Sequence, residues 1–386
     1  MVDVNVVILA GGASSRLFPF NKILSDLSGS GKTLIQQAFS RAATLAPRSA
    51  IHVLAVHDLV EPIAQQLRLP QRQFFVDPVR RGTWPALMWA MAHLRQGSDS
   101  VLAVLTGDHI IPRLPAFSRA AKQACSLAAK SPAMVMLGVN PGPDAALWTG
   151  YGVFRVDGSR VATFAEKPTL ADAQRMVQEE GWQWNSGMFF FRISTAEEAL
   201  AQFQPGMRSQ YDALCAAVGR GKTKEAARLY ADFPAKIPHP LDPARQVDNT
   251  IDFSIMTPLV HVPGHLQALA VCGGLPVWTD LGQWEALSDV LRRDRRNNLR
   301  LGRVTLDPAT QGCILAADQG YRLTVKGLRN AAIAVSKRGV LVVPRHELPR
   351  IKDHVAQAKG TRVKVVVGIP NVRVVRRERH IFVQNT

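Results

Sequence analysis

The sequence feature that most constrains the fold is residues 6–22, VVILAGGASSRLFPFNK. Its first five residues are all apolar and mostly β-branched, which predicts a buried parallel strand covered on both faces. Gly11 and Gly12 follow and allow backbone conformations that turn amide groups toward an anion. Arg16 and Lys22 would then supply positive charge. Ligands in such sheets bind beyond the carboxyl ends of the strands, so we expect an anion-binding loop, with a purely structural turn as the alternative.

Strands and helices alternate through the first part of the chain. The pattern predicts strands over residues 51–56, 73–76, 101–105 and 133–138, and helices over residues 33–46, 59–69, 84–95 and 116–130. This alternation favours an α/β fold with a doubly wound, mostly parallel, Rossmann-like sheet. Short strands with connecting helices continue to about residue 273, and their order in the sheet is left open.

The last quarter of the chain differs in both charge and pattern. Residues 288–386 hold 21 Lys and Arg against 7 Asp and Glu, whereas the preceding residues hold 26 against 23. A helix is expected over residues 284–296 and another over 346–359, with short β runs around the second. We therefore expect one domain at residues 1–287 and a smaller, basic, β-rich domain at residues 288–386, with a β-helix as the candidate architecture of the second.

Composition and spacing argue against several classes of protein. The chain is 47% hydrophobic and 20% charged, which is typical of soluble globular proteins, and it has no membrane-length apolar run. We expect a cytoplasmic protein. The four cysteines are far apart, so neither a zinc site nor a disulfide framework is expected. The GSGKT string at residues 29–33 is not a P-loop, because Asp26 stands where that motif needs glycine. Aromatic residues are sparse around the C-terminal arginines, so a nucleic-acid partner is not expected.

Two carboxylates are candidate metal ligands. Asp108 follows the apolar strand in VLAVLTGDHII, where it would serve as a hard oxygen ligand for Mg²⁺ or, alternatively, cap a turn. Asp280 in PVWTDLGQW has apolar neighbours, and a carboxylate there is costly unless a cation or hydrogen-bond donors compensate it. Its alternative role is to cap the helix that follows.

Two further strings have the residue types that bind a sugar phosphate. FAEKP at residues 164–168 places Glu166, an acceptor for sugar hydroxyls, beside Lys167, a point charge for a phosphate. WNSGMFFF at residues 184–191 presents Asn185, whose amide offers both a donor and an acceptor. Each string alone is a common turn, but both occur here in this order.

Taken together and in order, these strings resemble one enzyme family. GG-x3-RL-x-P-x2-K, TGDH, TGYG, EKP, WNSGMF and W-x-D-x-G-x-W are similar to motifs of the mannose-1-phosphate guanylyltransferases, also called GDP-mannose pyrophosphorylases, within the sugar-nucleotide nucleotidyltransferase superfamily. VDPVRRGTWPAL at residues 76–87 also resembles that family's EPxGRNTAPA segment. The chain departs from the family pattern at Ser14 and Ser15, where Gly-Thr is usual, and at Thr257, where glutamate is usual.

The resemblance implies a role for each matching residue. The nucleotide would be bound by Ala10, Gly11, Gly12, Arg16, Lys22, Arg81, Gly82, Thr83, Gly107 and Asp108. The sugar 1-phosphate would be bound by Gly152, Glu166, Lys167 and Asn185. Mg²⁺ would be held by Asp108 and Asp280. The catalytic residues would be Arg16, Lys22, Asp108 and Lys167.

The resemblance also implies the reaction. GTP and mannose 1-phosphate would give GDP-mannose and pyrophosphate, and the C-terminal β domain would either pack against the sugar site or build a homodimer. No membrane partner is expected. The attacking phosphate oxygen is already an anion, so positioning and charge stabilisation are needed rather than a general base. Two alternatives stay open: a uridylyl- or thymidylyltransferase acting on glucose 1-phosphate, and a non-catalytic regulatory subunit that binds a sugar nucleotide.

Overall fold

The structure, a computed structural model, describes residues 2–12, 17–95, 99–275, 277–351, 353–354 and 364–385. The chain forms two compact units. The first comprises Met1–Gly11, Ala38–Thr106 and Ile111–Trp278, and the second comprises Gly12–Gln37, Gly107–Ile110 and Thr279–Thr386. None of the helices in the described part of the chain has the length and apolar character that a membrane crossing requires.

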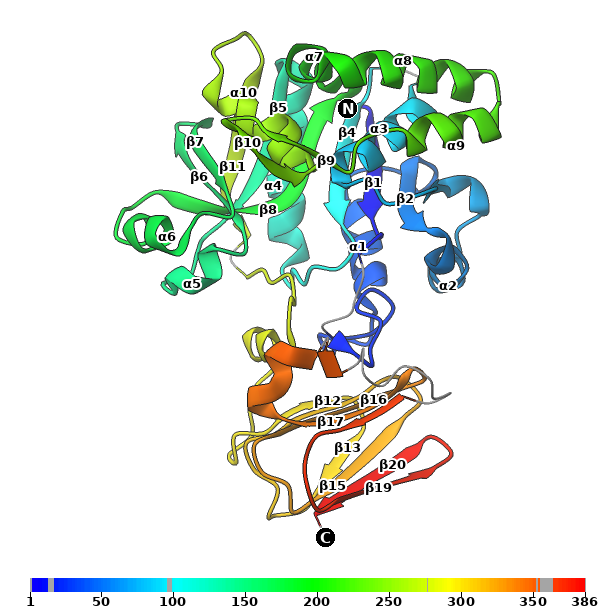
Figure 1. Ribbon diagram of the computed structural model, residues 1–386, viewed down its shortest axis with the longest axis vertical. Helices are drawn as coiled ribbons and strands as arrows, with labels where there is room; N and C mark the ends of the chain where they lie inside the picture. The colour runs from blue at the N-terminus through cyan, green and yellow to red at the C-terminus, as the bar shows by residue number, and fades with distance from the viewer. Residues whose placement is uncertain are drawn as a thin grey trace. The chain divides into compact units, whose positions relative to one another are not determined.

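A nine-stranded sheet in the order β3-β2-β1-β4-β8-β5-β11-β7-β6 forms the centre of the first unit (Figure 1). Its strands are β1 (Val4–Leu9), β2 (Ile51–Val56), β3 (Phe74–Asp77), β4 (Val101–Thr106), β5 (Ala133–Val139), β6 (Gly152–Asp157), β7 (Arg160–Glu166), β8 (Trp182–Arg192) and β11 (Gln267–Leu275). A separate antiparallel hairpin is formed by β9 (Lys236–His239) and β10 (Asp242–Asp248).

The direction of the strands changes across this sheet. Strands β3, β2, β1 and β4 are parallel, as are β5 and β11. Strand β8 lies antiparallel to both β4 and β5, and β6 and β7 form an antiparallel hairpin. The sheet is therefore mixed rather than mostly parallel. Apolar runs identify buried strands, but they carry no information about the direction in which each strand runs.

Ten helices are described in the chain, and five of them contribute to one large apolar cluster with the sheet. The ten are α1 (Leu34–Ala42), α2 (His57–Leu67), α3 (Thr83–Leu94), α4 (Leu114–Lys130), α5 (Ala145–Trp148), α6 (Leu170–Met176), α7 (Ile193–Phe203), α8 (Pro205–Gly219), α9 (Thr223–Ala231) and α10 (Thr257–His261). The five in the cluster are α3, α7, α8, α9 and α10. The buried side of α3 joins α7, α8 and sheet residues such as Val104 and Phe189 in this cluster. Figure 1 shows α7 and α8 following one another over the sheet, with α9 beside α8.

The second unit contains short strands that stack on one another. They are β12 (Leu299–Leu301), β13 (Val304–Leu306), β14 (Ile314–Ala317), β15 (Arg322–Lys326), β16 (Ala331–Ser336), β17 (Gly339–Pro344), β18 (Lys364–Val367), β19 (Val372–Arg377) and β20 (His380–Asn385). Strands β12, β14 and β16 pair in parallel in one sheet, and β13, β15 and β20 pair in parallel in another. Such stacking of successive chain segments is the pattern of a β-helix.

The segment after β1 packs into this second unit. Phe20 is fully buried, and its ring meets that of Trp284 edge to face, with centroids 5.4 Å apart. The Ser336 hydroxyl donates to the carbonyl of Pro19 at 2.5 Å, and the Arg338 guanidinium donates to the carbonyl of Phe20 at 3.1 Å. The basic loop predicted from the first motif is therefore anchored on strands near the end of the chain. The expected boundary between residues 287 and 288 stays a prediction, and the compact units divide the chain differently.

One expected helix is not formed as predicted, and the described part of another is helical. The segment expected to be helical over residues 284–296 has a 3-10 helix at Trp284–Asp289, followed by a β-bridge at Arg293. The segment over 346–359 has a 3-10 helix at Arg345–Arg350, and Ile351, Asp353 and His354 are α-helical, whereas residues 352 and 355–359 lie outside the described part. In the first segment, apolar spacing suited a helix, but pairing of Arg293 with Leu299 determined the backbone.

Candidate functional site

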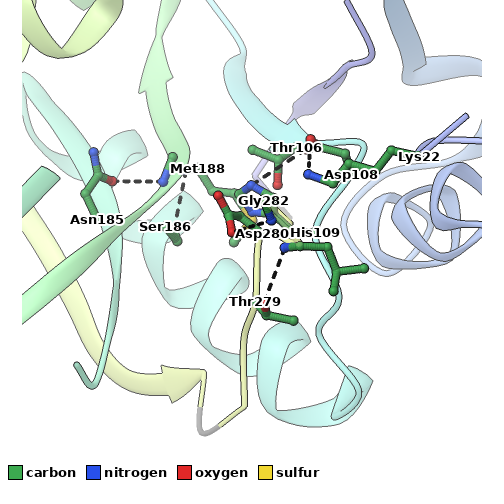
Figure 2. Close-up of polar contacts among 12 residues, drawn as sticks. Lys22, Thr106, Asp108, His109, Asn185, Ser186, Met188, Thr279, Asp280 and Gly282 are labelled. Atoms are coloured by element: carbon green, nitrogen blue, oxygen red, sulfur yellow. Dashed lines mark hydrogen bonds and ion pairs between the residues drawn. The ribbon is translucent and has the colours of Figure 1, made fainter. Parts of the chain in front are cut away.

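Lys22 and Asp108 meet in the second unit. The Nζ atom of Lys22 lies 2.6 Å from Oδ2 of Asp108 (Figure 2), and the two side chains are 12% and 31% exposed. Burial raises the pKa of the Asp108 carboxyl, but the charges of Lys22 and His109 and the hydrogen bond from Lys22 outweigh it, so the pKa falls below its ordinary value. Asp108 is therefore an anion at neutral pH, and the ion pair holds Lys22 beside it.

An isolated β-bridge between two chain segments brings Asp280 to the region of Lys22 and Asp108. The amide of Ile110 donates to the carbonyl of Thr279 at 3.0 Å, and the amide of Thr279 donates to the carbonyl of Ile110 at 3.2 Å. This antiparallel bridge sets the segment that carries Asp108 beside the segment that carries Asp280, as Figure 2 shows. The Oδ1 atom of Asp280 accepts from the amide of Gly282 at 3.1 Å, which fixes the carboxylate on its turn.

These two carboxylates fit a magnesium ion in donor chemistry. Mg²⁺ prefers hard oxygen ligands and is commonly bound by one or two carboxylates together with substrate phosphates and water. Asp108 and Asp280 supply such a pair, whereas no group of three or more His, Cys, Asp or Glu side chains in the described residues gathers as a metal site. Within the described residues, the arrangement therefore suits an ion that arrives with phosphates rather than one enclosed by protein ligands alone.

A second set of polar side chains lies in the first unit, at the end of β7 and near the start of β8. Asn185 is 7% exposed, and its Nδ2 donates to Oδ1 of Asp252 at 2.8 Å while its Oδ1 accepts from the amide of Gly187 at 3.0 Å. Oε1 of Glu166 lies 3.4 Å from Nζ of Lys167, whose side chain is 56% exposed. The set thus combines two carboxyls, an amide and an ammonium group within one unit.

The two carboxyls in this set influence each other's protonation. Burial, with a contribution from the nearby Asp252 charge, raises the pKa of Glu166 to about 8, although Lys167 opposes the rise. Burial likewise raises the pKa of Asp252 to about 6, against the opposing effects of its backbone hydrogen bond, Lys167 and Asn185. Near neutral pH, the pair therefore holds a proton and offers a hydrogen-bond donor as well as acceptors, which suits hydroxyl groups that do both.

Gly152 belongs to this set for a steric reason. A Cβ atom at position 152 would come within 2.5 Å of Oε2 of Glu166 and 3.3 Å of Cβ of Asn185. Gly152 opens β6 directly opposite Glu166 on β7. The carboxyl of Glu166 can therefore occupy its position only because residue 152 has no side chain.

The predicted nucleotide segment at residues 81–83 forms a turn before α3. Arg81 donates to the carbonyl of Ala231 at 2.5 Å, so its guanidinium is already engaged by protein. Gly82 has a φ of 109°, and a Cβ atom there would overlap the backbone of Asn249. The exposed Thr83 accepts from the amide of Ile251 at 3.2 Å through its hydroxyl oxygen. The nucleotide roles expected for these three residues stay predictions.

The glycine loop is open where it is described. A Cβ atom built on Gly11 or Gly12 would meet no atom of the described residues within 4 Å. Ala10 is buried and donates its amide to the carbonyl of Leu54 at 2.8 Å. Gly107 follows β4 directly and is buried. Arg16, the other cation expected here, lies outside the described residues.

Asp252 belongs to this set but stands in none of the motifs that predicted the site. It begins a π-helical turn at Asp252–Met256, a rare conformation that is frequent at functional sites. Thr257, noted as a departure from the family, donates its hydroxyl to the carbonyl of Asp252 at 2.9 Å and so supports this turn. The available signal was one acidic residue within the otherwise uncharged segment TIDFSIM at residues 250–256. Its contact with Asn185 joins positions far apart in the chain.

Comparisons with a family model and with known proteins identify relatives over most of the chain. The family model described as nucleotidyl transferase matches residues 5–297. Xanthan biosynthesis protein XanB of Xanthomonas campestris pv. campestris (strain B100) is 31% identical over 374 residues, which cover 93% of this chain and 74% of that protein. Mannose-1-phosphate guanylyltransferase of Klebsiella pneumoniae is 29% identical over 367 residues, which cover 90% of this chain and 72% of that protein.

A solved structure is similar over nearly the same length. The crystal structure described as mannose-1-phosphate geranyltransferase from Thermus thermophilus has a TM-score of 0.73 and 25% sequence identity, and the match covers 93% of this chain and all of that chain. The similarity thus includes the β-rich part that follows the sheet, as well as the sheet itself.

Proposed function

The chain is an enzyme of the nucleotidyl transferase family, and on this premise we propose that it transfers a guanylyl group from GTP to mannose 1-phosphate, giving GDP-mannose and pyrophosphate. The bridge between Ile110 and Thr279 carries this proposal, because it joins Asp108 and Asp280 beside the cation of Lys22. The choice of guanylyl and mannose is supported by the name of the Klebsiella pneumoniae relative.

We assign the phosphate chemistry to the Lys22, Asp108 and Asp280 set. Asp108 and Asp280 would hold Mg²⁺, which when bound neutralises phosphate charge. Lys22 would act as a point charge toward the departing pyrophosphate, with Arg16 as a second cation. The amides after β1 would bind phosphate oxygens, since the open space at Gly11 and Gly12 lets an anion approach the backbone. Positioning of two anions, rather than proton removal, is what these residues supply.

We assign the sugar phosphate to the Glu166, Lys167, Asn185 and Asp252 set. Glu166 and Asp252 would bind sugar hydroxyls, since the partly protonated pair both donates and accepts hydrogen bonds. Lys167 would bind the phosphate, because its half-exposed ammonium group can reach an anion while it remains near Glu166. Asn185 positions Asp252 through their hydrogen bond.

The fold and the assembly form part of the same proposal. We take the sheet as doubly wound and Rossmann-like, with α3 and α7 packed in the large cluster and α4 packed on β4, β5, β8 and β11 outside that cluster. The expected homodimer and cytoplasmic location stay predictions.

A substrate panel tests the function. The purified full-length chain is assayed for pyrophosphate release with GTP, ATP, UTP and dTTP, each combined with mannose 1-phosphate or glucose 1-phosphate in the presence of Mg²⁺. We expect the highest kcat/KM for GTP with mannose 1-phosphate. Preference for UTP or dTTP with glucose 1-phosphate would replace the proposal with that activity. Binding of GDP-mannose without turnover of any pair would favour a regulatory subunit.

A further inference from the structure

A strongly basic hairpin in the second unit has no part in the proposed reaction. Residues 291–303, LRRDRRNNLRLGR, contain six arginines and one acidic residue. Three of these arginines, Arg292, Arg293 and Arg300, line one pocket of about 480 Å³. A pocket of this size lies within the range of small-molecule sites, and the described residues that line it include no aromatic side chain on which a base would stack.

The hairpin fixes how these arginines face one another. Arg293 forms an antiparallel bridge with Leu299, and the amide of Asp294 donates to the carbonyl of Asn298 at 2.8 Å. This register sets Arg292 directly across from Arg300. Residues opposite one another in an antiparallel pair have Cβ atoms about 5 Å apart on the same face, so the two guanidinium groups extend from neighbouring positions.

Asp294 lines the same pocket, and its carboxylate holds the turn of the hairpin. Its Oδ1 accepts from the amides of Arg296 and Asn298, both at 2.9 Å, and its Oδ2 accepts from the Asn298 side chain at 3.2 Å. Burial raises the pKa of Asp294, but these hydrogen bonds and the charge of Arg300 together outweigh it, so the pKa lies below its ordinary value. The carboxylate is thus committed to the backbone that positions Arg292 and Arg300.

Neither of the opposed arginines forms an ion pair with a carboxylate that the structure describes. Arg293 has one, since its Nη2 lies 3.6 Å from Oε2 of Glu285, but no ion pair joins Arg292 or Arg300 to an acidic residue described by the structure. Like charges directly opposite one another destabilise a strand pair. An anion bound between them would remove that cost, and planar guanidinium groups bind phosphate oxygens in a bidentate manner.

We propose that this pocket binds the phosphate group of a small molecule between Arg292 and Arg300, with Arg293 on its wall. The ligand class is a phosphorylated metabolite, nucleotide or pyrophosphate, since all present the same phosphate chemistry to the arginines. The site lies wholly in the second unit, among residues to which the proposed reaction gives no role.

Arginine modification locates the binding event. The full-length chain is treated with phenylglyoxal, with and without inorganic pyrophosphate, at constant ionic strength, and the modification rate of each arginine is followed by peptide mass spectrometry. We expect pyrophosphate to slow modification of Arg292 and Arg300 several-fold and to leave the exposed Arg373 unchanged. This local readout separates the pocket from any pyrophosphate bound during turnover.

Substitution supplies a second, thermodynamic test. Without phosphate, Arg300→Gln is expected to raise the melting temperature, because it removes the repulsion with Arg292, whereas Arg373→Gln is expected to leave it unchanged. In calorimetric titrations, Arg300→Gln should weaken pyrophosphate binding at this site about tenfold or more, and Arg373→Gln should retain it. Parallel titrations with inorganic phosphate and mannose 1-phosphate distinguish the sources of the phosphate group.

Three results would overturn the inference. Equal modification rates with and without pyrophosphate would show that the pocket binds no phosphate. Equal protection by sulfate at the same ionic strength would show only a counter-ion atmosphere. Stronger protection by duplex DNA than by pyrophosphate would assign the arginines to a nucleic-acid surface instead.

Discussion

The ion pair between Lys22 and Asp108 leads to the first prediction. Asp108→Asn removes the negative charge that would hold Mg²⁺ and leaves the mostly buried Lys22 without its anion. We expect kcat to fall by about 100-fold or more and the free energy of unfolding to fall by about 1–3 kcal/mol. Pyrophosphate release and urea unfolding measure the two effects. Asp157→Asn, at an exposed hairpin position, is the matched control and should change neither.

A second prediction for a single residue concerns Glu166 and the dependence of the free energy of unfolding on pH. The pKa of Glu166 rises from 4.5 to about 8, so folding favours its protonated form. Its contribution to the free energy of unfolding is complete below about pH 4.5 and is lost as the pH rises through about 8. We expect stability to fall between pH 5 and pH 8 by on the order of 1 kcal/mol per pH unit from this group.

Glu166→Gln provides the check on that prediction. The amide does not titrate, so the dependence of unfolding free energy on pH should become flatter in this variant, while the exposed Glu180→Gln control should keep the slope of the original chain. Urea unfolding at pH 5, 6, 7 and 8 measures the slope. An identical slope in the Glu166→Gln chain would contradict the assignment of this raised pKa.

The β6–β7 hairpin allows a prediction at the scale of an element. In Gly152→Ala, the new methyl group would come within 2.5 Å of Oε2 of Glu166 and would displace that carboxyl. We expect kcat/KM for the sugar 1-phosphate to fall about tenfold, with little change in the KM for the nucleotide. Gly206→Ala, at a helical position where a Cβ atom meets nothing, is the control. Unchanged kinetics in Gly152→Ala would argue against a role for Glu166 in sugar binding.

Elements with a strong local pattern were predictable, and those determined by distant pairing were not. The apolar run of β1 and the helical spacing of α4 identify both elements from local sequence alone. The segment over residues 284–296 was predicted as a helix, yet Arg293 pairs with Leu299 and the chain turns between them. No local periodicity reports that pairing, because the partner residue lies beyond the predicted element.

The same limit applies to the candidate site. Glu166, Lys167 and Asn185 stand in short motifs and were selected from those motifs. Asp252 was not selected, because its hydrogen bond to Asn185 joins residues 67 positions apart. Nor does the motif around Lys22 indicate that Pro19 and Phe20 bond to Ser336 and Arg338. Chemistry is thus readable from residue types, whereas the contacts that position it depend on the complete fold.

At the scale of the whole molecule, cutting the chain at the predicted boundary after residue 287 would divide the apolar core of the second unit. Its core combines early residues with residues of the stacked strands: Leu17, Phe18, Phe20, Leu27, Leu34, Ile110, Leu299, Ile314, Ala316, Ala332, Ala334, Leu341 and Val343. Both partners of the Lys22–Asp108 pair lie in segments of this unit. The residues proposed to bind phosphate therefore depend on strands that come after residue 287.

This dependence predicts the behaviour of a shortened chain. A chain ending at residue 287 loses β14, β16 and β17 and exposes the apolar side chains that they cover, so we expect it to bind a hydrophobic dye, to aggregate and to lose turnover. Phe20→Ala in the chain of 386 residues tests the contribution of this core to stability alone. Its free energy of unfolding is expected to fall by about 3–5 kcal/mol, as is usual when a buried Phe is truncated. Dye fluorescence, light scattering and pyrophosphate release measure these outcomes. A shortened chain that stays monodisperse and fully active would show that the Lys22 loop keeps its conformation without the stacked strands.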